Sequence, residues 1–285
     1  MGGKRTFSCG AELDVLPTGR CLVNAHAGSA VAASNLGSVG LAPRLVRRRR
    51  RRPSIYVPLA LLMIAMSIIG FWPQYFRGVL TGVFEPRVQF WMIHLHAALF
   101  LGWLLLFLSQ AVLVWQGRSD LHFKMGSTIA TYGYLAAAVG TYGGFVLAAR
   151  RLEAGGTTDS AAAFLFLPLS DMVVFLGLLS LAIWYRRRPE IHKRLMVLAT
   201  MALGLVGLGR FIRRVPVLAE QPILAVLLTV SPILIGIAYD LVTRRKLYVV
   251  WVAGLFLYAL RPFRMSFASS DVWLPLGRVL LKPFL

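Results

Sequence analysis

The sequence predicts an all-α membrane protein: a bundle of seven transmembrane helices, with the N-terminus inside and the C-terminus outside (N-in/C-out). Of the 285 residues, 58% are hydrophobic and only 15% are charged, which is too apolar for a soluble domain of this length. Apolar windows long enough to cross a bilayer recur along the chain. Basic residues also alternate between dense and sparse loops, which is typical of multi-pass membrane proteins.

Residues 1–53 are predicted to form a disordered, basic N-terminal tail. The segment is rich in Gly, Ala, Ser and Arg, lacks periodic apolar residues and contains an arginine run at 47–52. No signal-peptide cleavage site follows the first apolar window, so we expect that window to be kept as a helix. Because no Met lies between Met1 and Met63, an over-extended gene start is a second interpretation of the tail.

Seven apolar windows define the predicted transmembrane domain, 54–263. A spanning helix needs about 20 such residues, and in lipid its backbone groups must be satisfied within the segment. The windows are 55–72, 89–115, 125–149, 161–185, 193–212, 222–239 and 247–262. The remaining segment, 264–285, mixes apolar residues with charges and prolines, and we expect it to lie along the outer interface.

The formal net charge of +20 is interpreted as a topology signal, with the lipid bilayer rather than nucleic acid as the partner. The denser loops carry Arg118 and Lys124, then 186–188 with 193–194, then 244–246. The sparser loops carry Arg77 and Arg87, 150–151 and 213–214. The denser side is predicted to be cytoplasmic.

Polar residues inside the apolar windows form the first candidate site: His94, His96, Gln110, Asp171 and Arg210. Asp171 lies near the predicted bilayer centre, where a carboxylate must be protonated, paired or part of an ion or proton path. Helix directions place all of these except Gln110 in the outer half, so we expect Asp171 to pair with Arg210 or a histidine. The alternatives are a purely structural pair, and an Arg210 side chain that reaches the lipid headgroups.

The second predicted helix carries both His94 and His96. Residues two apart on a helix point about 200° apart, so these histidines are not expected to share one small site. His96, Trp103 and Gln110 recur every seven residues, and we expect this stripe to face the bundle interior. Hydrogen-bonded helix packing and a functional site are both open interpretations of the stripe.

His122 and His192 begin the third and fifth predicted helices, each beside positive charge. Two histidines from different helices at one depth are what a bis-imidazole b-type haem requires, and nearby cations could meet its propionates. Headgroup binding or helix capping by these histidines is the alternative. Both cysteines, Cys9 and Cys21, lie in the tail, so no separate metal site is predicted within the membrane.

Several motifs resemble those of a family of uncharacterised bacterial multi-pass inner-membrane proteins. They are HLH at 94–96 with Gln110, LHxKxG at 121–126, RPEIHKRLM at 188–196, and Asp240 with Arg244-Arg245. The resemblance covers the chain from about residue 54 to its C-terminal region. It implies a location in a bacterial inner (plasma) membrane and no assigned chemistry. The paired helix-start histidines also look like those of small membrane proteins associated with haem-copper oxidases, and more loosely like those of dihaem transmembrane ferric reductases.

The sequence is therefore compatible with three functions. The first is a b-type haem, redox or respiratory-accessory protein with a redox partner in the membrane. The second is a small-molecule or proton permease that uses the intramembrane Asp/His/Arg cluster, and the third is a membrane scaffold or assembly factor. The sequence contains no Walker loop, dinucleotide-binding glycine fingerprint, His-Glu-x-x-His motif or nucleophile elbow, so it indicates no specific enzyme class.

Overall fold

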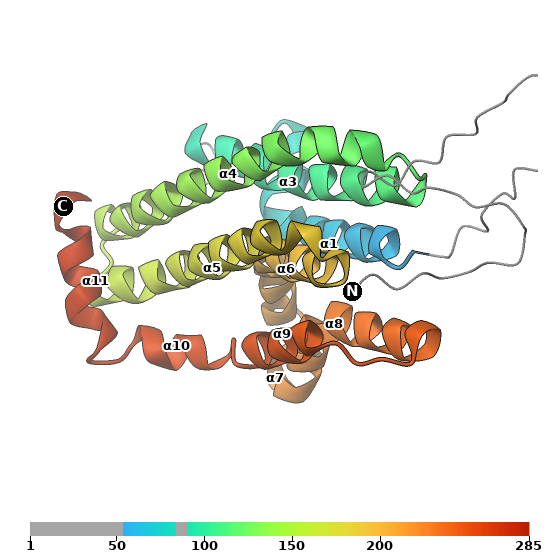
Figure 1. Cartoon of the computed structure of the whole chain (residues 1–285). Helices are drawn as coiled ribbons and strands as arrows, with labels where there is room; N and C mark the ends of the chain where they lie inside the picture. The colour runs from blue at the N-terminus through green and yellow to red at the C-terminus, as the bar shows by residue number, and fades with distance from the viewer. Residues whose placement is uncertain (1–53, 84–90, 285) are drawn as a thin grey trace, which may run out of the picture. The chain divides into compact units, whose positions relative to one another are not determined.

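The computed structural model describes residues 54–83 and 91–284, and over these residues it is helical and without strands. The predicted disordered tail lies outside the described residues. The all-α prediction is thus confirmed for the described part of the chain. Figure 1 shows the long helices packed alongside one another.

Six helical stretches in the described residues are long and apolar enough to cross a membrane. They are Tyr56–Thr81, which comprises α1 (Tyr56–Phe71), a π-helical turn (Trp72–Phe76) and α2 (Arg77–Thr81), then α3 (Trp91–Trp115), α4 (Ser119–Glu153), α5 (Thr158–Trp184, extended by a 3-10 turn to Arg187), α6 (Pro189–Arg214) and α8 (Pro222–Arg244). A multi-pass membrane protein is therefore supported. The seventh predicted crossing is not confirmed, because α9 (Val249–Ala259) has only 11 residues.

The first helix continues past the predicted end of its window at residue 72. Pro73 lacks a backbone N–H, and the helix accommodates it in the π-helical turn instead of ending there. The helix stops at Gly82, whose φ of 70° is a left-handed conformation that suits glycine. This extension adds polar side chains to one end of the bundle.

Helix α6 is the central and most buried of the six, and it contacts α1, α3, α5, α8 and α9. Its small residues allow close helix packing. A Cβ on Gly70 of α1 would overlap the backbone of Gly207, and Ser67 lies against Gly204. Close approach of this kind is typical of helix pairs in lipid, where small residues let two backbones meet.

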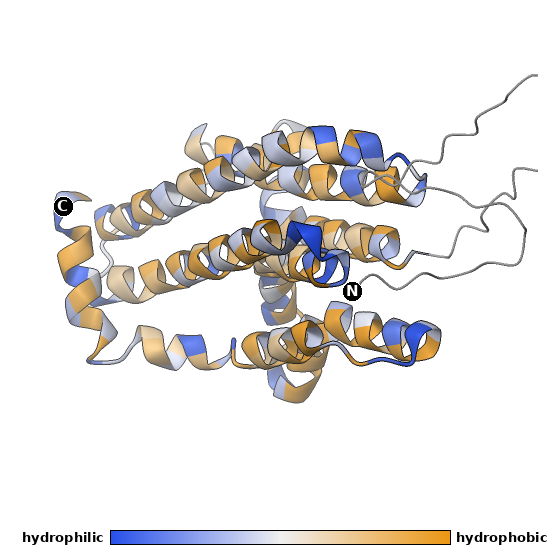
Figure 2. Ribbon diagram, viewed as in Figure 1, coloured by the Kyte–Doolittle hydropathy of each residue, from blue (hydrophilic) through white to orange (hydrophobic). Residues whose placement is uncertain are grey.

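Helix α4 uses its glycines for packing. A Cβ at Gly133 would meet the Trp103 and Leu179 side chains, and one at Gly140 would meet Met172 and Phe100. Hydrophobic residues cover most of the length of the long helices, and polar residues gather toward their ends (Figure 2).

Short helices complete the C-terminal part. Helix α7 (Pro216–Glu220) joins α6 to α8, whereas α10 (Phe263–Ala268) follows α9 after a break, and α11 (Trp273–Leu281) lies across the ends of α4 and α5 (Figure 1). Trp273 Nε1 donates a hydrogen bond of 2.8 Å to the Ala162 carbonyl. Arg278 on α11 pairs with Asp159 on α5 at 2.6 Å, and this carboxylate raises the pKa of the guanidinium. The interfacial location of segment 264–285 stays a prediction.

Two ends of the bundle are named below by the ends of α6. The Pro189 end holds the starts of α4, α6 and α9 and the ends of α3, α5 and α8. The Arg214 end holds the opposite termini of all these helices except α9, which ends beside the middle of α5.

Candidate functional site

Asp171 is the buried acid in the middle of α5, with 5% of its surface exposed. Its Oδ1 lies 2.5 Å from Nη1 of Arg264 and 3.0 Å from Nη2 of Arg261. Arg264 Nη1 also donates a 3.0 Å hydrogen bond to the hydroxyl of Ser170. We name Asp171, Arg261 and Arg264 the α5–α10 charge site.

This arrangement corrects the predicted partner of Asp171. Arg210 instead donates a 2.7 Å hydrogen bond to Gln74 Oε1, in the extension of the first helix. Of the partners of Asp171, Arg261 lies in the break between α9 and α10, and Arg264 lies in the first turn of α10. Arg264 was predicted to belong to the interfacial segment, but it contacts the middle of α5. The physical reason is that a cation stabilises a carboxylate buried there.

A cavity of about 160 Å³ opens beside the α5–α10 charge site. Its lining residues are Asp171, Val174, Leu257, Tyr258, Leu260, Arg261 and Arg264. Tyr258 donates its hydroxyl proton to the Leu198 carbonyl. The Tyr258 hydroxyl is therefore held against α6.

The charge of the site is unbalanced, since two guanidinium groups contact one carboxylate. The Nε atom of Arg264 is buried and has no hydrogen-bond partner among the described residues. Buried donors normally find a partner, and leaving one unsatisfied costs about 1–3 kcal/mol. The surplus positive charge therefore favours an additional negatively charged group at this site.

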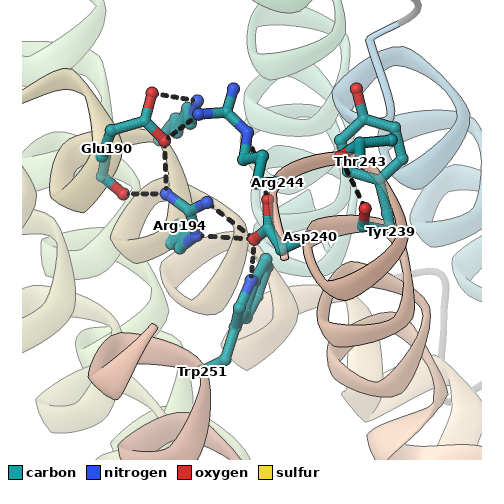
Figure 3. Close-up of polar contacts among 8 residues, drawn as sticks. Glu190, Arg194, Tyr239, Asp240, Thr243, Arg244 and Trp251 are labelled. Carbon is teal, nitrogen blue, oxygen red and sulfur yellow. Dashed lines mark hydrogen bonds and ion pairs between the residues drawn. The ribbon is translucent and has the colours of Figure 1, made fainter. Parts of the chain in front are cut away.

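A second buried charged group lies at the Pro189 end and joins α6, α8 and α9 (Figure 3). Arg194 Nε and Nη2 donate to Asp240 Oδ2 at 2.9 Å and 2.6 Å, and the indole N–H of Trp251 donates to the same oxygen at 2.8 Å. The guanidinium carbon of Arg194 also stacks over the ring of Tyr248, 3.4 Å from its centroid. We name Arg194, Asp240 and Trp251 the α6–α8 lock.

Glu190 connects the lock to the surface of the bundle. Its carboxylate lies 2.9 Å from Nη1 of Arg194, 2.8 Å from Nζ of Lys193 and 2.8 Å from Nη1 of Arg244. Arg194 Nη1 additionally donates to the backbone carbonyl of Glu190. Arg244 reaches back to Asp240 Oδ1 at 3.4 Å. The ion pairs of the lock are closely packed against the Tyr248 and Trp251 rings. A hydrogen-bonded network of this kind is suited to holding helices together.

The predicted histidines of the second helix, now α3, lie at the Arg214 end. His94 Nδ1 is 3.2 Å from the Tyr75 hydroxyl, and the His96 ring lies 3.8 Å from the Phe100 ring, centroid to centroid. The two histidines thus have different neighbours, as predicted from their spacing. His96 is also within electrostatic reach of Arg210. The structure therefore brings His94, His96 and Arg210 to one end, without Asp171.

Further along α3, Trp103 is buried as predicted, and its indole N–H lies 3.3 Å from the hydroxyl of Thr200 on α6. Gln110 Nε2 is buried and has no hydrogen-bond partner among the described residues. The stripe thus faces other helices at Trp103, and the role of Gln110 stays a prediction.

His122 and His192 lie together, with ring centroids 6.3 Å apart and planes at 74°. His192 Nδ1 is 2.8 Å from the Ala182 carbonyl. Because a carbonyl only accepts, this nitrogen carries the proton, and Nε2 is left for another partner. His122 Nδ1 is buried without a hydrogen-bond partner among the described residues.

The separation of the two histidine rings suits two ligands on opposite sides of one metal atom, which is the arrangement in a bis-imidazole haem. With metal–nitrogen distances of about 2.0–2.1 Å, two imidazoles sharing one metal have centroids about 6 Å apart. However, Lys193 and Arg194, two cations expected near the propionates, are paired with Glu190 and Asp240. The cavity beside the α5–α10 charge site does not border the histidines. No group of three or more metal-binding side chains occurs among the described residues.

Comparisons with known proteins gave no match: no family model, no curated protein and no solved structure matches this chain. The family resemblance of the motifs therefore stays a prediction, and the function has to be argued from the geometry.

Proposed function

We propose that this chain is a small-solute permease of a bacterial inner membrane, with its binding site at the α5–α10 charge site. The observation that carries the proposal is the cavity beside Asp171, Arg261 and Arg264. Charged side chains within membrane-spanning segments are costly, and they commonly mark pathways for ions or substrates.

The break between α9 and α10 supports this proposal. Together, residues 249–268 are about as long as one bilayer crossing, with the interruption at 260–262. In many transporters, discontinuous helices line the substrate site, because irregular backbone is tolerated where it borders a cavity. In our proposal this broken segment is the seventh crossing, which gives the N-in/C-out topology predicted from the basic loops.

The test is solute-dependent swelling of proteoliposomes that contain the full chain. The solutes are potassium phosphate, potassium chloride, glycine and glycerol, each supplied as an inward gradient. We expect at least one to enter faster than into protein-free liposomes, and Asp171→Asn and Arg264→Gln to abolish that entry. Arg278→Gln is the matched control, since it removes an arginine–aspartate pair outside the cavity. Folded protein that admits none of these solutes would contradict the proposal.

A second candidate function, haem-dependent redox or respiratory-accessory chemistry, is supported by the contact between His122 and His192. In it, the two imidazoles would be the axial ligands of a b-type haem. An optical spectrum of the purified protein tests it. A Soret band that is lost in both His122→Ala and His192→Ala is expected, and colourless, stable protein refutes it. A scaffold or assembly role is the interpretation left if both tests are negative.

A further inference from the structure

We infer that the cavity at the α5–α10 charge site binds a small oxyanion of the phosphate class, an inference that rests on the proposed function for its role in transport. The cavity, the charge count and the unsatisfied donor each point to this ligand.

Charge is the first argument. Within contact distance the site holds two guanidinium groups and one carboxylate, and the neighbouring Ser170 hydroxyl is neutral. The surplus is one positive charge beside the middle of α5, one of the helices long and apolar enough to cross a membrane. An uncompensated charge in a low-dielectric environment is strongly disfavoured, whereas one bound monovalent anion makes the site neutral. A cation would increase the surplus.

Hydrogen bonding is the second argument. Arg264 uses Nη1 for Asp171 and Ser170, while its buried Nε has no partner among the described residues. Arg261 contributes a second planar fork of donors beside it. Guanidinium groups bind phosphate and carboxylate through paired N–H donors, so two adjacent arginines favour an oxyanion.

Space is the third argument, and it separates this site from the α6–α8 lock. The lock is also rich in arginine, but aromatic rings lie against its charged groups. The centroid of the Tyr248 ring lies 3.4 Å from the Arg194 guanidinium carbon, and the Trp251 indole is hydrogen-bonded to Asp240. Beside Arg261 and Arg264 there is instead a cavity of about 160 Å³, enough for a tetrahedral oxyanion with part of its hydration shell.

The oxyanion has two sources with the same chemistry, namely free inorganic phosphate and the phosphate headgroup of an anionic lipid. Two measurements on the full-length protein in detergent distinguish them. The first is the thermal unfolding midpoint during titration with sodium phosphate. The second is native mass spectrometry after addition of phosphatidylglycerol. If free phosphate is the source, phosphate raises the midpoint; if a lipid headgroup is the source, phosphatidylglycerol stays bound and phosphate has no effect.

Variants test the mechanism through effects of opposite sign. Arg264→Gln and Arg261→Gln are each expected to weaken binding of the active probe roughly ten- to hundredfold, the loss of a charge-assisted hydrogen bond. Asp171→Asn is expected to tighten binding, because it raises the surplus charge to two. A purely structural role for Asp171 would only lower the midpoint. Arg278→Gln is the control and should leave binding unchanged.

The inference is overturned if neither probe binds, if Arg264→Gln and Arg261→Gln both bind as the wild type does, or if Asp171→Asn weakens binding. Should one arginine variant fail to fold, the other still gives the result. Phosphate binding without any solute uptake would leave the anion site standing and refute the permease. Uptake of glycine or glycerol that depends on Asp171, with no binding of either probe, would leave the permease standing and refute the anion site.

Discussion

The α6–α8 lock and the α5–α10 charge site use the same side-chain chemistry in opposite ways. In the lock, Arg194 and Asp240 are 0% and 1% exposed, and aromatic rings fill the space around them. At the charge site, two arginines share the single carboxylate of Asp171 beside a cavity. A tightly packed arginine–aspartate pair thus joins two helices, whereas a pair with a surplus cation and open space beside it leaves room for a further group.

The largest expected effect comes from breaking the lock. Arg194→Met should lower the free energy of unfolding by about 3–5 kcal/mol, because it leaves Asp240 buried without its main partner. Reversible unfolding in mixed micelles with increasing sodium dodecyl sulfate measures this loss. Arg264→Gln should cost less, since Asp171 keeps Arg261.

A double variant, Arg194→Met with Asp240→Leu, sharpens that result. Replacing both members of a buried ion pair by apolar residues of similar volume is often neutral or stabilising. We therefore expect most of the lost stability to return. If the double variant is less stable than Arg194→Met alone, the lock contributes more than the ion pair.

A smaller effect is expected from Gly236→Ala on α8. A Cβ there would lie 2.5 Å from the Trp251 ring, so the lock has no room for a methyl group. Overpacking of this kind costs about 1–3 kcal/mol. Gly177→Ala on α5 is the control, because nothing lies within 4 Å of its Cβ position. Equal effects of the two substitutions would show that packing around Trp251 is looser than described.

Added volume at the charge site should have a still smaller effect on stability. Val174→Phe projects into the cavity and is expected to change the free energy of unfolding by less than about 1 kcal/mol, because the space is open. The same substitution should abolish the phosphate or lipid response by occupying the ligand's place. A stable Val174→Phe protein that still binds the probe would place the ligand elsewhere.

The smallest effect is expected from Arg278→Gln. Both Arg278 and Asp159 are about half exposed, and exposed ion pairs contribute little to stability. The unfolding midpoint should be unchanged within error at moderate salt. A clear loss would mean that α11 is held to α5 mainly through this pair and not through Trp273.

The sequence was sufficient to predict the six long helices but not the polar contacts between them. Hydropathy located the six long helices, because an apolar window of bilayer length allows little else. It also indicated that His122 and His192 share a depth, and the structure places their rings together. Asp171 was recognised as a buried charge from its position alone.

The partners of Asp171 could not be predicted from the sequence, for two physical reasons. Depth along a helix follows from residue number, but the direction in which a side chain points within the bundle does not. Asp171 was therefore assigned to Arg210, although Arg261 and Arg264 face it. Moreover, the last window ends at residue 262 and Arg264 belongs to the predicted interfacial segment, so its contact with α5 does not follow from hydropathy. Arg194 was counted as a topology charge, and its contact with Asp240 went unnoticed.

The span between Arg194 and Asp240 also affects how the chain is made. The two residues lie 46 positions apart, so at about 5–20 residues per second the ribosome supplies Asp240 roughly 2–9 seconds after Arg194. During that interval the permanent partner of Arg194 has not been synthesised. Glu190, four positions earlier, is already present and contacts the same guanidinium. It can serve as a temporary counter-ion during insertion, before the later helices arrive.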